Sequence, residues 1–382
     1  MVKNKFFTFI FLLISIFHLS GQRLSETAYI GILTCGSGDE LYSTFGHTAI
    51  HICDTNKHLD IVFNYGTFNF NTPNFYVKFS QGRLPYMLSV SSFNAFLYEY
   101  QQEGRWVVEQ KLNLTPEEKE KMNDLLIQNY SPENRYYAYD FFMDNCATRV
   151  RDVIKASLID RTIFQEHTTK DNASFRELIY PYTTSMLWWR FGIDLGLGMR
   201  CDKPASNIQY MFLPNELMNQ LDTVNIDHES IVKTKAVIVK ENREPLSKSV
   251  SPTLITSILC LLVMLFTLWE NRKKTYFAWL DIILFTFISL LSLLIAYLWF
   301  CSNHYTTKFN FNLLWANPLL IYVWIRLRNS HTIILFIALG LIALPLLFFW
   351  LLPQTFNTAT FPLMLLYALR IGNLIKQKRK LV

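Results

Sequence analysis

Several features that commonly identify a protein's chemistry are absent from this chain of 382 residues. It has six cysteines, too few and too scattered for a disulfide framework, and no CxxC pair or His/Cys cluster with the spacing of metal ligands. No P-loop, internal repeat or low-complexity tract occurs. The sequence therefore predicts no metal site and no nucleotide cofactor, and it gives no sign of a repeat architecture.

Charged residues are also scarce, at 17% of the chain, whereas hydrophobic residues reach 51% and aromatic residues 15%. This hydrophobic content is high for a purely soluble protein, and two regions hold the excess. At the N-terminus, Lys3 and Lys5 precede an apolar run over residues 6–17, and Ser20 and Gly21 follow it. This order predicts a secretory signal cleaved near Gly21, and the lack of a cysteine there argues against the chain being a lipoprotein itself.

The second excess consists of five apolar runs that are candidates for membrane spans. They cover residues 253–268, 277–300, 313–327, 332–352 and 361–374. Basic residues follow the first, third and fifth runs. The connections after the second and fourth runs, residues 301–312 and 353–360, carry almost no basic residues. The positive-inside rule then places the N-terminal domain on the outer side of the membrane and the C-terminus in the cytoplasm. The net charge of +6 mostly reflects this topology, so no nucleic-acid partner is predicted.

Residues 45–66 alternate in polarity like two strands joined by a polar turn. The antiparallel register that we expect sets His51 opposite Asp60 and His47 opposite Asn64. One face of the hairpin is then apolar and the other carries a polar row. Such a row is costly in an otherwise apolar hairpin unless it is solvated or used.

Further elements give the exported part of the chain an α+β character. Strands are expected near residues 86–91 and 105–112, and a helix begins after Thr115, which combines with Glu118 into a capping box. The predicted division is a signal peptide at 1–21, an α+β domain at 22–222, a membrane-proximal segment with a strand or two at 223–251, a five-helix membrane domain at 252–375 and a basic tail at 376–382.

The stretch "FFMDNCATRVRDVIKASL" places Cys146 at the start of an amphipathic helix, with Asp144 or Asn145 as the N-cap. Two interpretations stay open for this cysteine. The helix terminus would lower the pKa of the thiol and make it a nucleophile. A packed thiol is the alternative, and it is the commoner fate of a single buried cysteine.

A cysteine nucleophile needs an imidazole to accept its proton and a polar group to hold that imidazole. Cys146, His47 and Asn64 supply these three parts. Histidine before cysteine is the order of circularly permuted papain-like folds. In particular, "GHTAIHI" followed by "DNCATRV" resembles the histidine strand and the Asn-Cys helix of the lecithin:retinol acyltransferase group.

A longer resemblance covers essentially the whole chain after the signal. The runs "LTCGSGDELYSTFGHTAIHICD", "LDIVFNYGTFNFNTPNFYVKFSQGRLPYML", "EGRWVVEQKLNLTPEEKEKM" and "NRYYAYDFFMDNCATRVRDVI" resemble the periplasmic domain of the Lnb family of bacterial lipoprotein N-acyltransferases. The run "FNLLWANPL" is similar to that family's membrane region. The resemblance implies a permuted papain-like, NlpC/P60-like exported domain followed by an all-α membrane domain.

This resemblance also implies a reaction and its partners. A phospholipid would donate a fatty acyl chain, through a thioester, to the α-amine of a diacylglyceryl-cysteine lipoprotein at the membrane bilayer, without a cofactor. The family pattern puts His47 and Cys146 in the catalytic roles. It does not fix the third member, for which we prefer Asn64, with Asp60 as the alternative. Backbone N–H groups at the helix start could stabilise the oxyanions.

Other residues are weaker candidates. Tyr65, Arg83, Tyr139 and Arg149 could line a substrate site, Arg149 either by binding phosphate or simply as part of a solvated face. His51 and His58 are expected to be structural or solvated, and a Cys35–Cys53 bridge is possible. The 186–191 stretch either packs within a subdomain or lies at the membrane interface.

Two other functions compete with the acyltransferase prediction. A peptidoglycan amidase or peptidase could use the same cysteine and histidine, but it would not need five spans. A membrane-tethered sensor or assembly protein would use Cys146 for packing alone.

Overall fold

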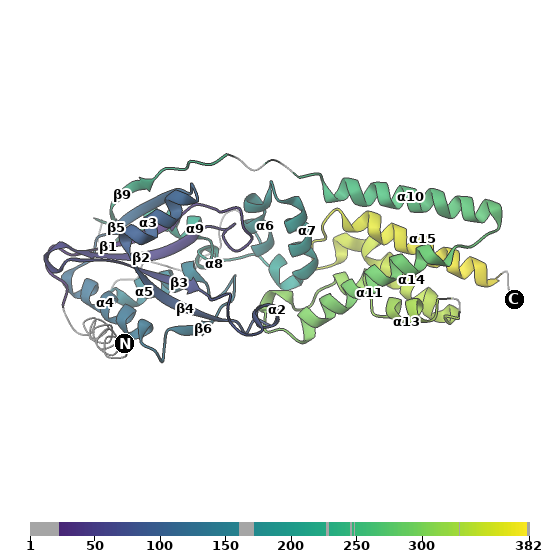
Figure 1. The fold of residues 1–382 in the computed structure, drawn as a ribbon, viewed down its shortest axis with the longest axis horizontal. Coiled ribbons are helices and arrows are strands. Elements are labelled where there is room, and N and C mark those ends of the chain that lie inside the picture. The colour runs from purple at the N-terminus through teal and green to yellow at the C-terminus, as the bar shows by residue number, and fades with distance from the viewer. Residues whose placement is uncertain are drawn as a thin grey trace, which may run out of the picture. The chain divides into compact units, whose positions relative to one another are not determined.

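A computed structural model describes residues 23–159, 172–226, 229–244, 247, 249–327 and 329–379, with element labels as in Figure 1. The predicted signal peptide lies outside the described residues. The chain forms two compact units. The first comprises Met1–Pro73, Leu84–His167 and Ser206–Glu244, and the second comprises Asn74–Arg83, Thr168–Ala205 and Pro245–Val382. This division differs from the predicted domains because two segments of the expected exported domain belong to the second unit.

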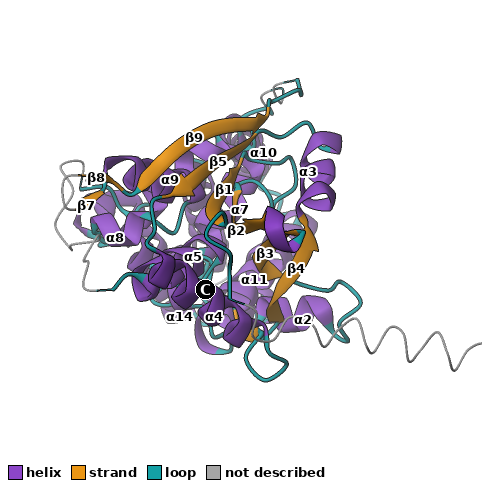
Figure 2. Cartoon of the chain, turned by 90° about the vertical axis from the view of Figure 1, so that its left-hand side faces the viewer, coloured by secondary structure: helices purple, strands orange, loops and turns teal. Residues whose placement is uncertain are grey.

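The first unit is built on a seven-stranded antiparallel sheet in the order β6-β4-β3-β2-β1-β5-β9. All of these strands except β6 are labelled in Figure 2. The strands are β1 (Tyr29–Cys35), β2 (His47–Asp54), β3 (Leu59–Thr67), β4 (Pro85–Ser92), β5 (Val107–Leu112), β6 (Tyr136–Ala138) and β9 (Val232–Val239). The predicted strands near 86–91 and 105–112 are β4 and β5. Two short strands, β7 (Asn225–Ile226) and β8 (Glu229–Ser230), pair with each other.

The β2–β3 hairpin forms as expected, but its register differs from the predicted one by two residues. Asp54 pairs with Leu59, so His51 lies opposite Val62 rather than Asp60. The turn is tighter than expected because Asp54 stays in the strand, where its carboxylate accepts hydrogen bonds from the N–H and hydroxyl groups of Ser25. A shift of two residues leaves every side chain on its predicted face, so the polar row persists with diagonal contacts.

Helices cover both faces of this sheet (Figure 1). One face packs against α4 (Pro116–Tyr130), α5 (Cys146–Ser157) and α9 (Pro214–Thr223), and the other against α3 (Phe93–Gln102). The alternation along β2 divides the core: Ile50 and Ile52 face α5, whereas Ala49 belongs to the cluster beneath α3. Helix α4 begins with the predicted capping box, and the short α8 (Asn207–Tyr210) precedes α9.

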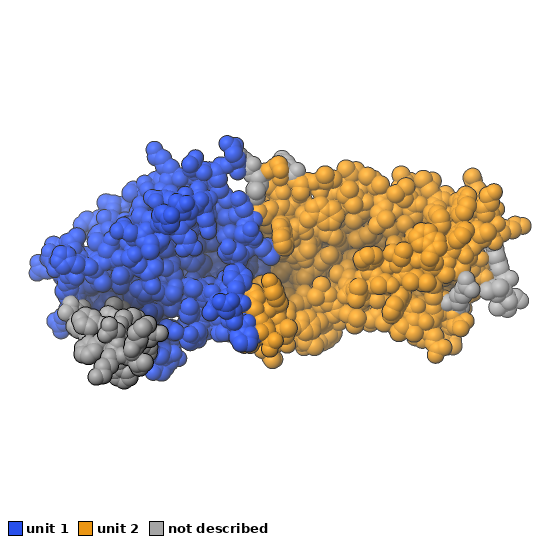
Figure 3. All heavy atoms as spheres, viewed as in Figure 1, with its two compact units in different colours: residues 1–73, 84–167, 206–244 blue, residues 74–83, 168–205, 245–382 orange. Residues whose placement is uncertain are grey.

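The second unit, shown in orange in Figure 3, contains a helix at each of the five predicted membrane runs. Among the described residues, three helices are long and apolar enough to cross a membrane: Pro252–Lys273, Ala278–Phe300 and Thr332–Leu351. The third run is interrupted at Asn317 and Pro318, so it forms two short helices. The helices of this unit are α2 (Phe75–Ser80), α6 (Phe175–Ile179), α7 (Leu187–Gly196), α10 (Pro252–Lys273), α11 (Ala278–Phe300), α12 (Asn312–Trp315), α13 (Leu319–Ile325), α14 (Thr332–Phe348) and α15 (Thr360–Arg379).

A buried ion cluster joins three of these helices. Arg370 of α15 donates from Nε to Asp281 of α11 at 2.6 Å and from Nη1 to Glu270 of α10 at 2.5 Å. All three side chains are fully buried. Charged groups among apolar helices are costly unless they are paired, so this cluster fixes how the three helices pack.

All six cysteines lie in described residues and are free thiols. The possible Cys35–Cys53 bridge is excluded by the sheet register. Cys35 pairs with His47 at one end of β1, whereas Cys53 pairs with Tyr29 at the other end. Six residues of extended strand separate the two positions by about 20 Å, far beyond the reach of a disulfide.

Candidate active site

Helix α5 presents Cys146 as its first residue. Its N-cap is Asn145, one of the two residues predicted for that position, and this side chain is almost fully buried. The Asn145 Oδ1 accepts a hydrogen bond from the Thr148 N–H at 2.9 Å, and Nδ2 donates to the carbonyl oxygens of Phe141 at 2.8 Å and Phe212 at 2.7 Å. An aspartate could not make the two donations, so the asparagine both begins the helix and ties it to neighbouring segments.

His47 opens strand β2 directly after a glycine in the left-handed region. Gly46 has φ +80°, and a Cβ there would lie 2.6 Å from the carbonyl oxygen of Cys35. The His47 Nε2 lies 3.3 Å from Oδ1 of Asn64, whose Nδ2 donates to the Ser91 hydroxyl. Because an amide oxygen only accepts, we assign the proton to Nε2, which leaves the Nδ1 lone pair as the basic position.

The strand that carries His47 reaches the helix that carries Cys146. The backbone N–H groups of Thr48, the residue after His47, and of Ala147 and Cys146 lie close enough to the Cys146 thiol to lower its pKa. On β3, a Cβ added to Gly66 would lie 3.7 Å from the Cys146 Cβ. The start of β2, the end of β3 and the first turn of α5 therefore enclose the thiol.

Two tyrosines continue this enclosure. A Cβ on Gly66 would lie 3.4 Å from the Tyr139 ring and 3.9 Å from the Tyr137 hydroxyl. The charge of Arg149 is already neutralised nearby, since its guanidinium lies over the Tyr137 ring at 4.1 Å and donates to Asp144 at 2.7 Å. This pairing favours a packing role for Arg149. Tyr137 was not predicted as a site residue, although the aromatic run before the cysteine was a signal, and Asp144 was predicted only as a possible N-cap.

Burial controls the protonation of both reactive groups. It raises the pKa of Cys146 to about 11, although the three backbone N–H groups act in the opposite direction. It also lowers the pKa of His47 to about 4, with the charge of Arg105 adding to the effect and the bond to Asn64 opposing it. The resting site at neutral pH holds a thiol and a neutral imidazole. The lowered cysteine pKa expected from the helix terminus is wrong, because desolvation outweighs the helix dipole.

This protonation state predicts how Cys146 reacts with iodoacetamide. Only the thiolate reacts, so alkylation should be slow near neutral pH and should accelerate about tenfold per pH unit until the pKa of about 11 is approached. Mass spectrometry of the Cys146 peptide measures the rate, with the exposed Cys301 as the reference thiol. A rate that already reaches its plateau on the acid side of neutrality would instead indicate a thiolate–imidazolium pair.

Comparison with known protein families agrees with this geometry. Residues 22–180 match the Lnb N-terminal periplasmic domain, and residues 244–381 match the Lnb transmembrane domain. The chain belongs to the Lnb family. No curated protein and no solved structure shows a significant match to it. The resemblance read from the sequence is thereby confirmed, and it indicates a membrane-associated, lipoprotein-processing protein with a periplasmic domain.

Two other predicted residues of this Lnb protein lie in different surroundings. Tyr65 is buried in the core against α5, and its hydroxyl accepts a hydrogen bond from Asn129 at 2.8 Å. Burial raises the pKa of Tyr65, which suits a packing role. Arg83 ends the Asn74–Arg83 segment, which belongs to the second unit.

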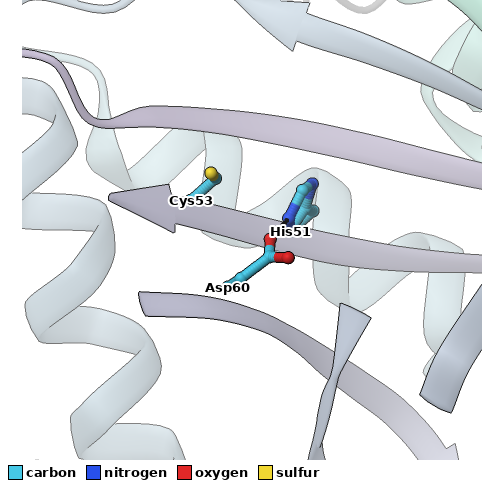
Figure 4. A group of neighbouring side chains, drawn as sticks. All are labelled: His51, Cys53 and Asp60. Atoms are coloured by element: carbon cyan, nitrogen blue, oxygen red, sulfur yellow. Dashed lines mark hydrogen bonds and ion pairs between the residues drawn. The ribbon is translucent and has the colours of Figure 1, made fainter. Parts of the chain in front are cut away.

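Asp60, the alternative third member, contacts a different histidine. His51 is fully buried, with Nε2 2.7 Å from Asp60 and Nδ1 2.6 Å from Glu109. Cys53 lies beside His51 and Asp60 (Figure 4). The possible metal-ligand atoms of these three residues all lie within 4.8 Å of one another. Among the described residues this is the one group that could hold a metal ion. Both ring nitrogens of His51 already contact carboxylates. We therefore interpret His51 as a structural residue that links β2 to Asp60 of β3 and Glu109 of β5.

Proposed function

We propose that this Lnb protein is a lipoprotein N-acyltransferase that works through a thioester on Cys146. The observation that carries the proposal is the meeting of the Cys146 helix terminus with the strand that begins at His47. The order of these elements, histidine strand before cysteine helix, supports a permuted papain-like arrangement. Asn64 is the third member in this proposal because it contacts His47, whereas Asp60 does not.

In the first half of the reaction, the Cys146 sulfur attacks the ester carbonyl carbon of a phospholipid. The thiol proton passes to His47 Nδ1 as the sulfur–carbon bond forms, so the reaction does not need a thiolate that has formed beforehand. The N–H groups of Thr48, Cys146 and Ala147, which act on the Cys146 thiol, would stabilise the oxyanion that forms beside the sulfur. When the tetrahedral intermediate collapses, the carbon–oxygen bond breaks and the imidazolium returns the proton to the departing lysophospholipid oxygen.

In the second half, the α-amine of a diacylated lipoprotein attacks the thioester carbonyl. His47 accepts a proton from the amine, and collapse of the second intermediate breaks the carbon–sulfur bond. The sulfur recovers that proton from His47, and the amide product leaves. Atoms and charges balance without a nucleotide, and the thioester conserves the energy of the donor ester.

The second unit supports a membrane location for this chemistry. It contains the three membrane-length helices and also α7, whose Trp188 and Trp189 are exposed. The end of α7 is fixed to the loop that follows α11, through the Gly198 N–H and the Thr306 carbonyl at 2.8 Å. Tryptophan favours the interface of a bilayer. We place this region at the outer leaflet of the inner membrane, with the C-terminus in the cytoplasm.

Trapping the acyl-enzyme tests the proposal. Purified protein given phospholipid but no amine should gain one fatty acyl group on Cys146, which hydroxylamine removes and a diacylated lipopeptide accepts. Intact-protein and peptide mass spectrometry measure each step. A Cys301→Ser variant is the control because it lacks the exposed thiol. Absence of the adduct while lipopeptide acylation continues would overturn the thioester route.

Asn64→Ala should reduce the acylation rate about tenfold to a hundredfold with little loss of stability. Asn64 holds the His47 tautomer but does not touch the reacting atoms, so the main effect should be on kcat. Steady-state kinetics and a thermal unfolding curve measure the two quantities. Ser91→Ala, which removes only the outer partner of Asn64, should have a smaller effect. An unchanged rate in Asn64→Ala would exclude this positioning role.

A further inference from the structure

Aromatic side chains of the first unit form a continuous run between the protein surface and the reactive cysteine. Tyr139 stacks on Tyr86 with ring centroids 4.3 Å apart, and Tyr86 contacts Phe68 at 5.3 Å. Phe68 in turn lies 4.9 Å from Phe70 and 6.1 Å from Tyr42. These side chains come from four separate parts of the chain, so their contact is a product of the fold rather than of local sequence.

The inner end of this run lies near the thiol, beside a glycine. A Cβ on Gly66 would lie 3.4 Å from the Tyr139 ring and 3.7 Å from the Cys146 Cβ. Gly66 has φ +88°, which other residues rarely adopt. The strand irregularity between Asn64 and Thr67 produces this backbone conformation. Because Gly66 has no Cβ, it adds no side chain to the space beside Tyr139 and Cys146.

The outer end of the run is exposed to solvent. Tyr42 and Phe70 expose 64% and 60% of their surface, whereas Tyr86 exposes only 8%. The two outer rings are thus exposed, whereas Tyr86 is buried and Tyr139 is partly buried. Clustered aromatic groups of this kind on a protein surface commonly mark a binding site.

We propose that the run of Tyr42, Phe70, Phe68, Tyr86 and Tyr139 binds the fatty acyl chain that is carried to Cys146. The inference rests on the proposed function, and it names the acyl subsite of that same site. A chain esterified to Cys146 has its carbonyl carbon at the inner end, and its methylene groups extend over the rings toward Tyr42 and Phe70. Aromatic ring faces suit an alkyl chain better than a sugar or a peptide, which need directed hydrogen bonds.

The test compares long and short acyl donors in the full-length protein. Cys146 acylation is followed by mass spectrometry with palmitoyl and with butyryl phospholipids. Only the palmitoyl chain is long enough to reach Phe68 and the outer rings. Phe68→Ala should therefore lower the palmitoyl rate about tenfold while sparing the butyryl rate, because each lost methylene contact is worth about fourfold. The double variant Tyr42→Ser with Phe70→Ser should lower the palmitoyl rate by a smaller factor.

Tyr98→Ser is the matched control. Tyr98 is an equally exposed aromatic residue, at 62%, but it lies on α3 on the opposite face of the sheet. Its palmitoyl-to-butyryl ratio should equal that of the native protein. A folding defect in Phe68→Ala would lower the palmitoyl and butyryl rates together. In that case the palmitoyl-to-butyryl ratio of the Tyr42→Ser, Phe70→Ser double variant, which changes only exposed side chains, would decide whether the run binds the acyl chain.

Two outcomes are distinguishable. An unchanged palmitoyl-to-butyryl ratio in the outer double variant and in a folded Phe68→Ala would overturn the acyl subsite and leave the thioester mechanism standing. Failure of both donors to acylate Cys146 in the native protein would overturn the proposed function, and this inference with it.

Discussion

Cys146→Ser should leave the protein folded and inserted in the membrane but unable to N-acylate lipoproteins. The side chain is 7% exposed, and a hydroxyl of nearly the same size keeps its packing. The reaction depends on transfer of the thiol proton to a weakly basic imidazole. A serine hydroxyl has a far higher pKa than even a buried thiol, so we expect a loss of at least about 10³-fold. Conversion of diacylated to triacylated lipoprotein, resolved by mass spectrometry, measures the activity.

His47→Asn should cause a comparable loss, and the double variant should be little worse than either single one. Removing one member of a nucleophile–base pair already abolishes most of what the pair achieves. His58→Asn is the matched control, because His58 lies exposed in the turn of the same hairpin with φ 53°, a conformation that asparagine tolerates. A Cys146→Ser protein with the native rate would refute the thioester mechanism and favour the sensor function.

Much of the site's framework was predictable because it depends on local sequence. The capping preference of asparagine and the spacing of apolar residues fixed where α5 begins, and so placed Cys146 in its first turn. The period of two in the hairpin placed His47 and Asn64 on one face even though the register differed by two residues. Alternate residues of a strand share a face, so the face of each side chain can be predicted from its position in the strand. The pairing register also depends on the turn and on partners that are distant in sequence, such as Ser25.

The properties that depend on three-dimensional surroundings were not predictable. The pKa of Cys146 is raised because the surrounding core excludes water, and no sequence pattern reports that exclusion. The aromatic run that ends at Tyr139 likewise brings together side chains from distant segments. The membership of α2 in the second unit follows from contacts more than 200 residues apart, such as the Ser80 hydroxyl with Tyr297 and the Phe79 carbonyl with His304.

The second large effect is expected in the membrane unit, where Arg370→Met should strongly destabilise the packing of α10, α11 and α15. Arg370 also donates to the Thr267 hydroxyl at 2.8 Å, so its guanidinium holds two carboxylates and a hydroxyl together. Its removal leaves Glu270 and Asp281 buried without their cation. Breaking a buried pair in this way costs about 3–5 kcal/mol. Thermal unfolding in detergent, followed by helix content, measures the loss.

A triple variant separates the cost of unpaired charge from the loss of specific contacts. Arg370→Met combined with Glu270→Leu and Asp281→Leu removes all three charges, so it should recover most of the stability that the single substitution loses, because apolar side chains of similar volume need no solvation. Arg272→Met, at an exposed position in the last turn of α10, should change stability by less than about 0.5 kcal/mol. If the single variant were as stable as the native protein, Arg370 would not hold these helices together. If the triple variant were no more stable than the single one, the directed hydrogen bonds rather than charge balance would determine how the helices associate.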